Sequence, residues 1–105
     1  MQRVCFTMRL RPERADDYLA AHETVWPDML DALRDAGWND YSLFLDRDEG
    51  LVVGYLQTED FDAAVAAMAE REVNTRWQAG MAGYFVDGTA PDGSLKRLTE
   101  YFHLD

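Results

Sequence analysis

Cysteine is almost absent from this chain of 105 residues, and Cys5 is the only one. A single thiol forms no disulfide within the chain and makes no metal framework, so the composition fits a reducing compartment. The chain also lacks an apolar run of the roughly 20 residues that cross a bilayer. Met1 leads directly into a strand-like run, without the basic and apolar regions of a signal peptide. We therefore expect a cytoplasmic protein.

Positive charge is scarce as well. The chain has 10 Lys and Arg residues against 20 Asp and Glu residues, which gives a formal net charge of −10. Such a balance repels the phosphates of nucleic acids and of anionic lipids, and it argues against an anionic substrate. The composition predicts a neutral or cationic small-molecule partner, with no nucleic acid and no membrane among the partners.

Repeats, low-complexity tracts and linkers are also lacking, so residues 1–105 are expected to form a single domain with a modest core. Apolar alternation indicates strands, and a period near 3.6 residues indicates helices. The elements expected in chain order are a strand at 3–11, a helix at 13–36, strands at 41–46 and 51–58, a helix at 61–70, a helical segment capped by Asn74, a turn-rich loop at 86–94 and a strand at 98–104.

Local signals mark where these elements begin and end. Pro12 ends the first strand and suits the start of a helix, and Gly37 is placed to stop that helix. The letters RDEG at 47–50 join two apolar strands as a hairpin. Asp60 is placed to cap the helix that follows it.

The order β-α-β-β-α-β predicts an α+β fold of the ferredoxin-like type, with an antiparallel sheet and helices on one face. Leu43 and Phe44 point to opposite faces of one strand, and Val52 and Val53 do the same in the next. Apolar residues on both faces imply that the helix-free face is also covered. A second copy of the chain is the simplest cover, so the sequence predicts a homodimer.

The letters YLAAHETVWP at 18–27 place an ionisable side chain on the apolar side of the expected helix. On a helical wheel, His22 falls inside the apolar arc, one turn after Tyr18 and one turn before Trp26. Two interpretations stay open: a core histidine bonded to a backbone carbonyl, or a functional histidine that faces a ligand. Pro27 is expected to kink the helix beside His22, and such a bend can open a pocket.

Other chemistries have less support. HETVW lacks the second histidine of a zincin, and no convergent ligand accompanies His22 and His103, so neither a metal nor a cofactor is expected. Serine and cysteine nucleophile motifs are absent. Tyr41 and Trp77 belong either to the core or to a ligand site, where aromatic rings stack on sugars. A histidine ringed by aromatics in an acidic protein suits proton transfer on a neutral ligand.

Four stretches, AAHETVWPDML, NDYSLFLD, VNTRWQAGM and EYFHLD, resemble the L-rhamnose mutarotase family over essentially the whole chain. The resemblance implies a dimeric ferredoxin-like barrel without metal or cofactor, which interconverts the anomers of a monosaccharide by opening and closing the ring. It also implies that His22 is the catalytic acid and that Tyr18, Tyr41 and Trp77 contact the sugar.

One position departs from the family pattern. Gln78 stands where the family commonly has a second tryptophan, so an amide replaces a stacking ring. We expect Gln78 to line the pocket and to alter sugar preference, towards L-fucose or another 6-deoxyhexose. Two further alternatives stay open because fold does not decide function: a haem-degrading or monooxygenase-like barrel, and a sugar-binding module without catalysis.

Overall fold

The computed structural model describes residues 1–86 and 91–105, and residues 87–90 of the expected loop at 86–94 lie outside them. The elements, in chain order, are β1 (Gln2–Arg9), η1 (Pro12–Arg14), α1 (Ala15–Ala21), α2 (Pro27–Asp35), β2 (Asn39–Asp46), β3 (Leu51–Thr58), α3 (Phe61–Ala69), α4 (Glu72–Met81), η2 (Ala82–Tyr84), η4 (Pro91–Gly93) and β4 (Lys96–Leu98). In the part of the chain described, no helix is long and apolar enough to span a bilayer.

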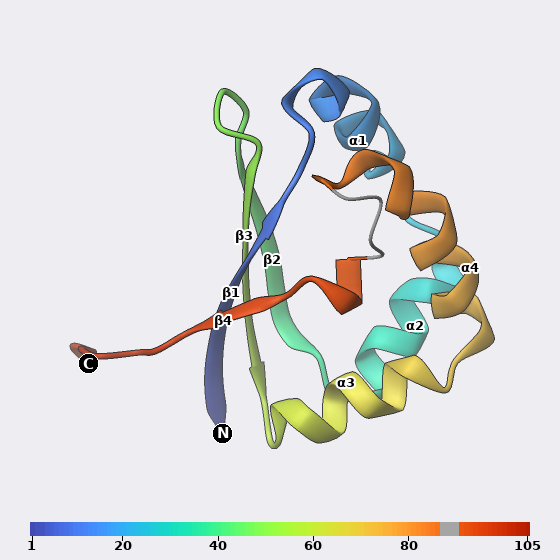
Figure 1. Cartoon of the computed structure of the whole chain (residues 1–105). Helices are drawn as coiled ribbons and strands as arrows, with labels where there is room; N and C mark the ends of the chain where they lie inside the picture. Colours follow the sequence, from blue (N-terminus) through green and yellow to red (C-terminus); the bar gives the residue numbers. More distant parts are fainter. Residues whose placement is uncertain (87–90) are drawn as a thin grey trace.

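The strands form one antiparallel sheet in the order β2-β3-β1-β4. The sheet stands on one side of the molecule, and α1 to α4 all lie on its other side as a second layer (Figure 1). This is the predicted α+β arrangement with helices on one face, and the ferredoxin-like expectation is confirmed. The alternation expected in the first strand is also confirmed, because its inward side chains are buried: Val4, Phe6, Met8 and Leu10.

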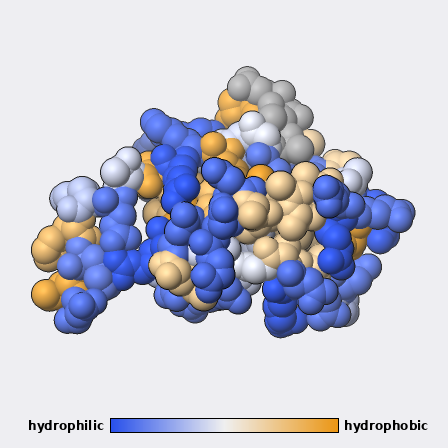
Figure 2. All heavy atoms as spheres, turned by 90° about the horizontal axis from the view of Figure 1, so that it is seen from below, coloured by the Kyte–Doolittle hydropathy of each residue, from blue (hydrophilic) through white to orange (hydrophobic). Residues whose placement is uncertain are grey.

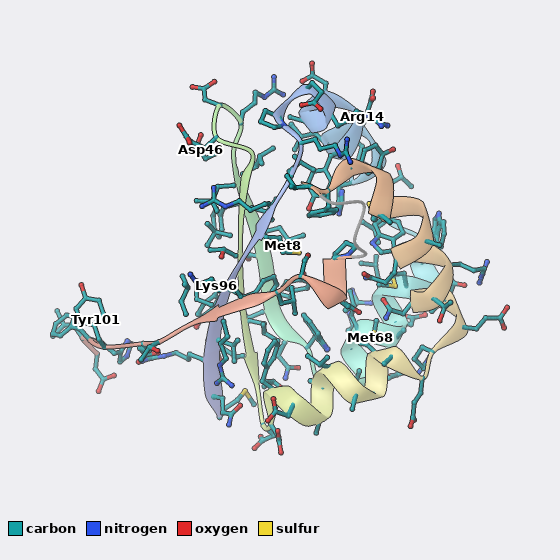
Figure 3. The ribbon with its side chains drawn as sticks, viewed as in Figure 1. Met8, Arg14, Asp46, Met68, Lys96 and Tyr101 are labelled. Atoms are coloured by element: carbon teal, nitrogen blue, oxygen red, sulfur yellow. The ribbon has the colours of Figure 1, made fainter. Side chains whose placement is uncertain are left out.

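The core fills the space between the two layers. Met8 of β1 and Met68 of α3 both point into this space (Figure 3). At its lower end, the indole N–H of buried Trp38 donates to the carbonyl of Ala64 at 3.1 Å, which ties the start of β2 to α3. Gly54 of β3 lies opposite Phe6 of β1, and the Phe6 ring occupies the space that a Cβ would need.

The single helix expected at 13–36 is wrong. The chain forms two helices, α1 and α2, separated by a bend at 22–26. Pro27 is the first residue of α2, not a kink within one helix. A proline restricts the residue before it to extended backbone, and Trp26 has φ −56° and ψ 133°. The helical wheel therefore does not hold beyond His22, and Trp26, which was expected one turn further along the same helix, is more than a third exposed.

Two other expectations need correction. Asn74 does not cap a helix, since α4 begins at Glu72 with Arg71 as its N-cap, and Asn74 is buried in the first turn. The strand expected at 98–104 ends at Leu98, because β1 pairs with β4 only from Cys5 to Thr7. Beyond that point the described sheet offers no partner strand, and the chain runs away from the body towards its C-terminus (Figure 1).

The remaining end signals are confirmed. Gly37 follows α2 with φ +90°, and Gly50 ends the hairpin turn with φ +65°. These are backbone conformations that glycine adopts without steric cost. Asp60 caps α3, because its carboxylate accepts from the backbone N–H of Ala63 at 3.2 Å.

Candidate active site

A cavity of about 230 Å³ lies between the helix-covered face of the sheet and helices α2 and α4. It is smaller than the 300–1,000 Å³ of sites for drug-sized ligands, which suits a compact ligand. Most of its lining is apolar. The polar side chains that line it are Tyr18, His22, Tyr41, Asn74, Gln78 and Asp92.

His22 is the residue that immediately follows α1, at its C-cap. Its Nδ1 lies 2.9 Å from the backbone carbonyl oxygen of Tyr18. A carbonyl only accepts, so Nδ1 carries the hydrogen and Nε2 is the ring nitrogen left for proton exchange. The carbonyl bond is the one that the first interpretation predicts, and the ligand of the second interpretation stays a prediction. The histidine is bonded to a carbonyl, and it is half-buried at the cavity rather than sealed in the core.

Aromatic rings fix the orientation of His22 from two sides. The ring centroids of Tyr18 and His22 are 4.4 Å apart, and the Trp77 ring meets the imidazole edge-on at 5.4 Å. Trp26 in turn packs edge-on against Trp77 at 5.1 Å. The bend at 22–26 thus brings Trp26 over α4 and encloses the imidazole.

The two tyrosines of the cavity are held as neutral phenols. Burial raises the pKa of Tyr18 to about 12. Burial also raises the pKa of Tyr41 strongly, with smaller contributions from the charges of Tyr18 and Asp92. Near neutral pH both hydroxyls therefore donate and accept hydrogen bonds and do not act as phenolate bases.

Opposite α2, the cavity wall carries a polar cluster that sequence reasoning missed in part. Asn74 and Gln78 lie one turn apart on α4, and the Gln78 side chain donates to the Asn74 carbonyl oxygen at 3.2 Å. Asn74 donates to one carboxylate oxygen of Asp92 at 3.0 Å. Burial raises the pKa of the Asp92 carboxyl, and the Asn74 bond partly offsets this. The i, i+4 spacing of Asn74 and Gln78 was visible in the sequence, whereas nothing singled out Asp92.

All five residues predicted for the site line this one cavity: His22, Tyr18, Tyr41, Trp77 and Gln78. They come from α1, β2 and α4, which are distant in the sequence. Within residues 1–86 and 91–105, no group of three His, Cys, Asp or Glu side chains is placed to hold a metal ion.

Comparison with known proteins shows where this arrangement recurs. Residues 3–104 match the family model described as L-rhamnose mutarotase. A relative from Burkholderia orbicola named L-rhamnose mutarotase is 40% identical over 107 aligned positions, which cover 100% of both chains.

Solved structures share the fold. The crystal structure of an L-rhamnose mutarotase from Formosa agariphila superposes with a TM-score of 0.80 at 24% identity over 100% of both chains. An antibiotic biosynthesis monooxygenase superposes with a TM-score of 0.62 at 17% identity, over 96% of this chain and 99% of that one. The second likeness agrees with the expectation that this fold hosts other chemistries. The match over residues 3–104 and the full-length relative show that the chain belongs to the L-rhamnose mutarotase family.

Proposed function

We propose that this protein is an isomerase that interconverts the α and β anomers of L-rhamnose by acid and base catalysis of ring opening and closure. The observation that carries the proposal is the His22 imidazole at a cavity of about 230 Å³, where the Tyr18 carbonyl holds Nδ1 and no described residue bonds Nε2. Family membership supplies the substrate class.

His22 acts as the acid. Ring opening breaks the bond between the anomeric carbon and the ring oxygen, and it needs a proton on that oxygen and loss of one from the anomeric hydroxyl. Protonated Nε2 gives its proton to the ring oxygen. A water takes the hydroxyl proton, because Tyr18 and Tyr41 are held neutral and are poor bases. The aldehyde rotates, and closure on its other face returns the protons.

Tyr18, Tyr41 and Trp77 bind and orient the sugar. Tyr18 and Tyr41 offer hydroxyls to the sugar's polar edge. Trp77, which also packs against His22, offers an aromatic edge or face to the C–H bonds of the sugar ring. Neutral donors and an aromatic wall suit an uncharged ligand, in keeping with the net charge of −10.

Saturation-transfer NMR on the anomeric protons tests the proposal. At a catalytic concentration of protein, transfer between the α and β signals of L-rhamnose should exceed the protein-free rate many times over. L-Fucose and other 6-deoxyhexoses run in parallel decide the preference. Binding of L-rhamnose without faster exchange would instead identify a sugar-binding module. A sugar other than L-rhamnose exchanging fastest would replace the proposed substrate.

We further propose that the protein is a homodimer in the cytoplasm, formed through the helix-free face of the sheet. Leu43 lines the cavity, while its neighbour Phe44 faces the other way with its side chain 62% exposed. The C-terminal segment adds exposed apolar residues, Tyr101, Phe102 and Leu104. Viewed from below, hydrophobic side chains stand out at the projecting end of an otherwise largely hydrophilic face (Figure 2). Because the strands carry apolar residues on both faces, a second copy of the chain is the simplest partner to bury the helix-free face.

A further inference from the structure

Gln78 is bound on both sides of its amide by other groups of the protein. Its side-chain N–H donates to Asn74 at 3.2 Å, and its carbonyl oxygen accepts from the backbone N–H of Asp92 at 2.9 Å. The residue that departs from the family pattern therefore ties the short turn η4 to α4, so a sugar hydroxyl meets an amide whose carbonyl oxygen is already engaged. Gln78 therefore affects the cavity by holding the backbone of Asp92.

Asp92 is held by two contacts that leave one of its oxygens open. Gln78 fixes its backbone, and Asn74 donates to its Oδ2 at 3.0 Å while also donating to the Met68 carbonyl at 3.1 Å. The described residues give no hydrogen bond to Oδ1, and no buried side-chain oxygen among them is left without a partner. Oδ1 is therefore not buried, and Asp92 lines the cavity.

The carboxylate is unusual at this position. Among the residues that the structure describes, Asp92 is the only carboxylate that lines the cavity, and burial makes its charge costly, as the raised pKa records. No described cation pairs with this carboxylate, so a ligand that donates hydrogen bonds to it offsets part of the desolvation free energy. Sugar hydroxyls are such donors, and a carboxylate accepts from two neighbouring hydroxyls at once.

The two helical walls of the cavity differ in polarity in a way that matches a 6-deoxyhexose. The wall from α2 and the bend before it is apolar and consists of Val25, Met29, Leu30 and Leu33. The wall from α4 and η4 carries Asn74, Gln78 and Asp92. A 6-deoxyhexose has a methyl group at one end and hydroxyls along its ring, so the apolar wall suits the methyl group and the polar wall suits the hydroxyls.

We propose that Asp92 is a substrate-binding residue whose free carboxylate oxygen accepts hydrogen bonds from ring hydroxyls of the sugar, and that Gln78 is a positioning residue that holds Asp92 there. The proposal rests on the mutarotase function and deepens it by naming the group that reads the hydroxyls. His22 does the proton chemistry at the anomeric centre, and Asp92 selects which sugar is presented to it.

Two variants of Asp92 test this role. Asp92→Asn keeps an oxygen for Asn74 and the backbone bond to Gln78 but loses the charge, and Asp92→Leu removes every polar atom. We expect Kd and KM for L-rhamnose to rise about tenfold in the Asn variant and about 100-fold in the Leu variant, with kcat changed less than threefold. Asp48→Asn, an exposed change in the β2–β3 turn, is the matched control.

Three analogues of L-rhamnose, each lacking one of the hydroxyls at positions 2, 3 and 4, separate this role from a structural one. For an analogue that lacks a hydroxyl bound by Asp92, the parent protein and the Asp92 variants should have Kd values closer together than they have for L-rhamnose. For the other analogues, the variants should show the same rise in Kd as for L-rhamnose. An equal loss for all three, a loss confined to kcat, or an unchanged Kd in a folded Leu variant would overturn the proposal.

Gln78→Met tests the positioning role, because methionine has similar length and no hydrogen-bonding amide. Gln78→Met should show the same pattern of Kd values across the three analogues as Asp92→Asn does. The double variant Gln78→Met/Asp92→Asn should lose less affinity for L-rhamnose than the product of the two single losses. If the two losses of affinity multiply fully in the double variant, Gln78 does not act through Asp92. If the parent protein binds L-rhamnose without exchanging its anomers, the mutarotase function fails while the Kd pattern still decides the role of Asp92. If it does not bind L-rhamnose, both fail.

Discussion

At the scale of single residues, substitution of His22 distinguishes a catalytic role from a packing role most directly. Its Nδ1 is bonded to the Tyr18 carbonyl, and two aromatic rings hold the imidazole. We expect His22→Ala and His22→Asn to lose about 10²–10⁴-fold in the rate of anomer exchange, the usual contribution of a positioned acid or base. The Asn variant should melt closer to the parent because its amide N–H can still donate towards the backbone.

The same two variants also show whether His22 serves only the fold. A histidine that serves only the fold predicts lower melting temperatures with an unchanged rate per folded molecule. Exchange at the parent rate in a normally melting Asn variant would therefore rule out His22 as the acid. Circular dichroism melts alongside saturation-transfer NMR give both quantities on one sample.

Asp92 makes a prediction about stability that is independent of activity. Burial raises its carboxyl pKa in the folded state, so the folded protein holds the proton more tightly than the unfolded chain does. The free energy of unfolding then falls as pH rises through the window between the unfolded and the folded pKa. Asp92→Asn cannot ionise, so it should be the more stable protein at pH 7, and its advantage should vanish at pH values below the ordinary carboxyl range. Urea unfolding at the two pH values measures the difference. An advantage that grew on acidification would contradict the sign.

At the scale of elements, β3 approaches β1 so closely at Gly54 that a Cβ there would clash with the Phe6 ring. Phe6 also lines the cavity. Gly54→Ala should therefore lower the free energy of unfolding by about 1–3 kcal/mol through overpacking. It should also weaken sugar binding by moving that ring.

Gly80 on α4 provides the control for Gly54. A Cβ there meets nothing within 4 Å, so Gly80→Ala should raise the free energy of unfolding by up to about 1 kcal/mol through helix propensity. Urea unfolding of both variants compares them directly. Equal effects of the two substitutions would show that the contact with Phe6 does not matter.

Elements with local signals could be predicted from the sequence, and those set by distant contacts could not. Alternation in β1 and the Asp60 cap need only neighbouring residues. The break before Pro27 was signalled by the proline itself, but a continuous apolar period hid it. The short β4 depends on how far β1 can pair with it, which no local pattern records.

The candidate site divides in the same way. His22 and Tyr18 were identified because they lie four residues apart, one at the C-cap of α1 and the other within it, and carry distinctive chemistry. Asp92 was missed because its partners Asn74 and Gln78 are 18 and 14 residues away in the chain. Among 20 acidic residues, only the fold distinguishes Asp92, the one carboxylate of the described residues that lines the cavity.

At the scale of the whole molecule, the helix-free face of the sheet is the surface through which we propose that two copies associate. Phe44 pairs across the sheet with Val53, and Tyr55 pairs with Cys5 on the next strand. These side chains lie on the face opposite the cavity, where the described chain has no helix (Figure 1). Burying them against a second copy removes apolar area from water at about 25 cal/mol per Å², and this is the driving force for the proposed dimer.

Phe44→Asp should therefore turn the dimer into a monomer, because it replaces an exposed apolar ring on β2 of that face with a charge. Light scattering at micromolar concentration measures the change. Leu19→Asp puts the same charge on an exposed apolar position of α1, outside both the sheet face and the cavity, and should leave the dimer intact. Since the cavity lies on the helix-covered face of the sheet and Phe44 on the other, a folded Phe44→Asp monomer should still exchange anomers. A parent protein that is monomeric at micromolar concentration, or a Phe44→Asp variant that stays dimeric, would show that this face is not the interface.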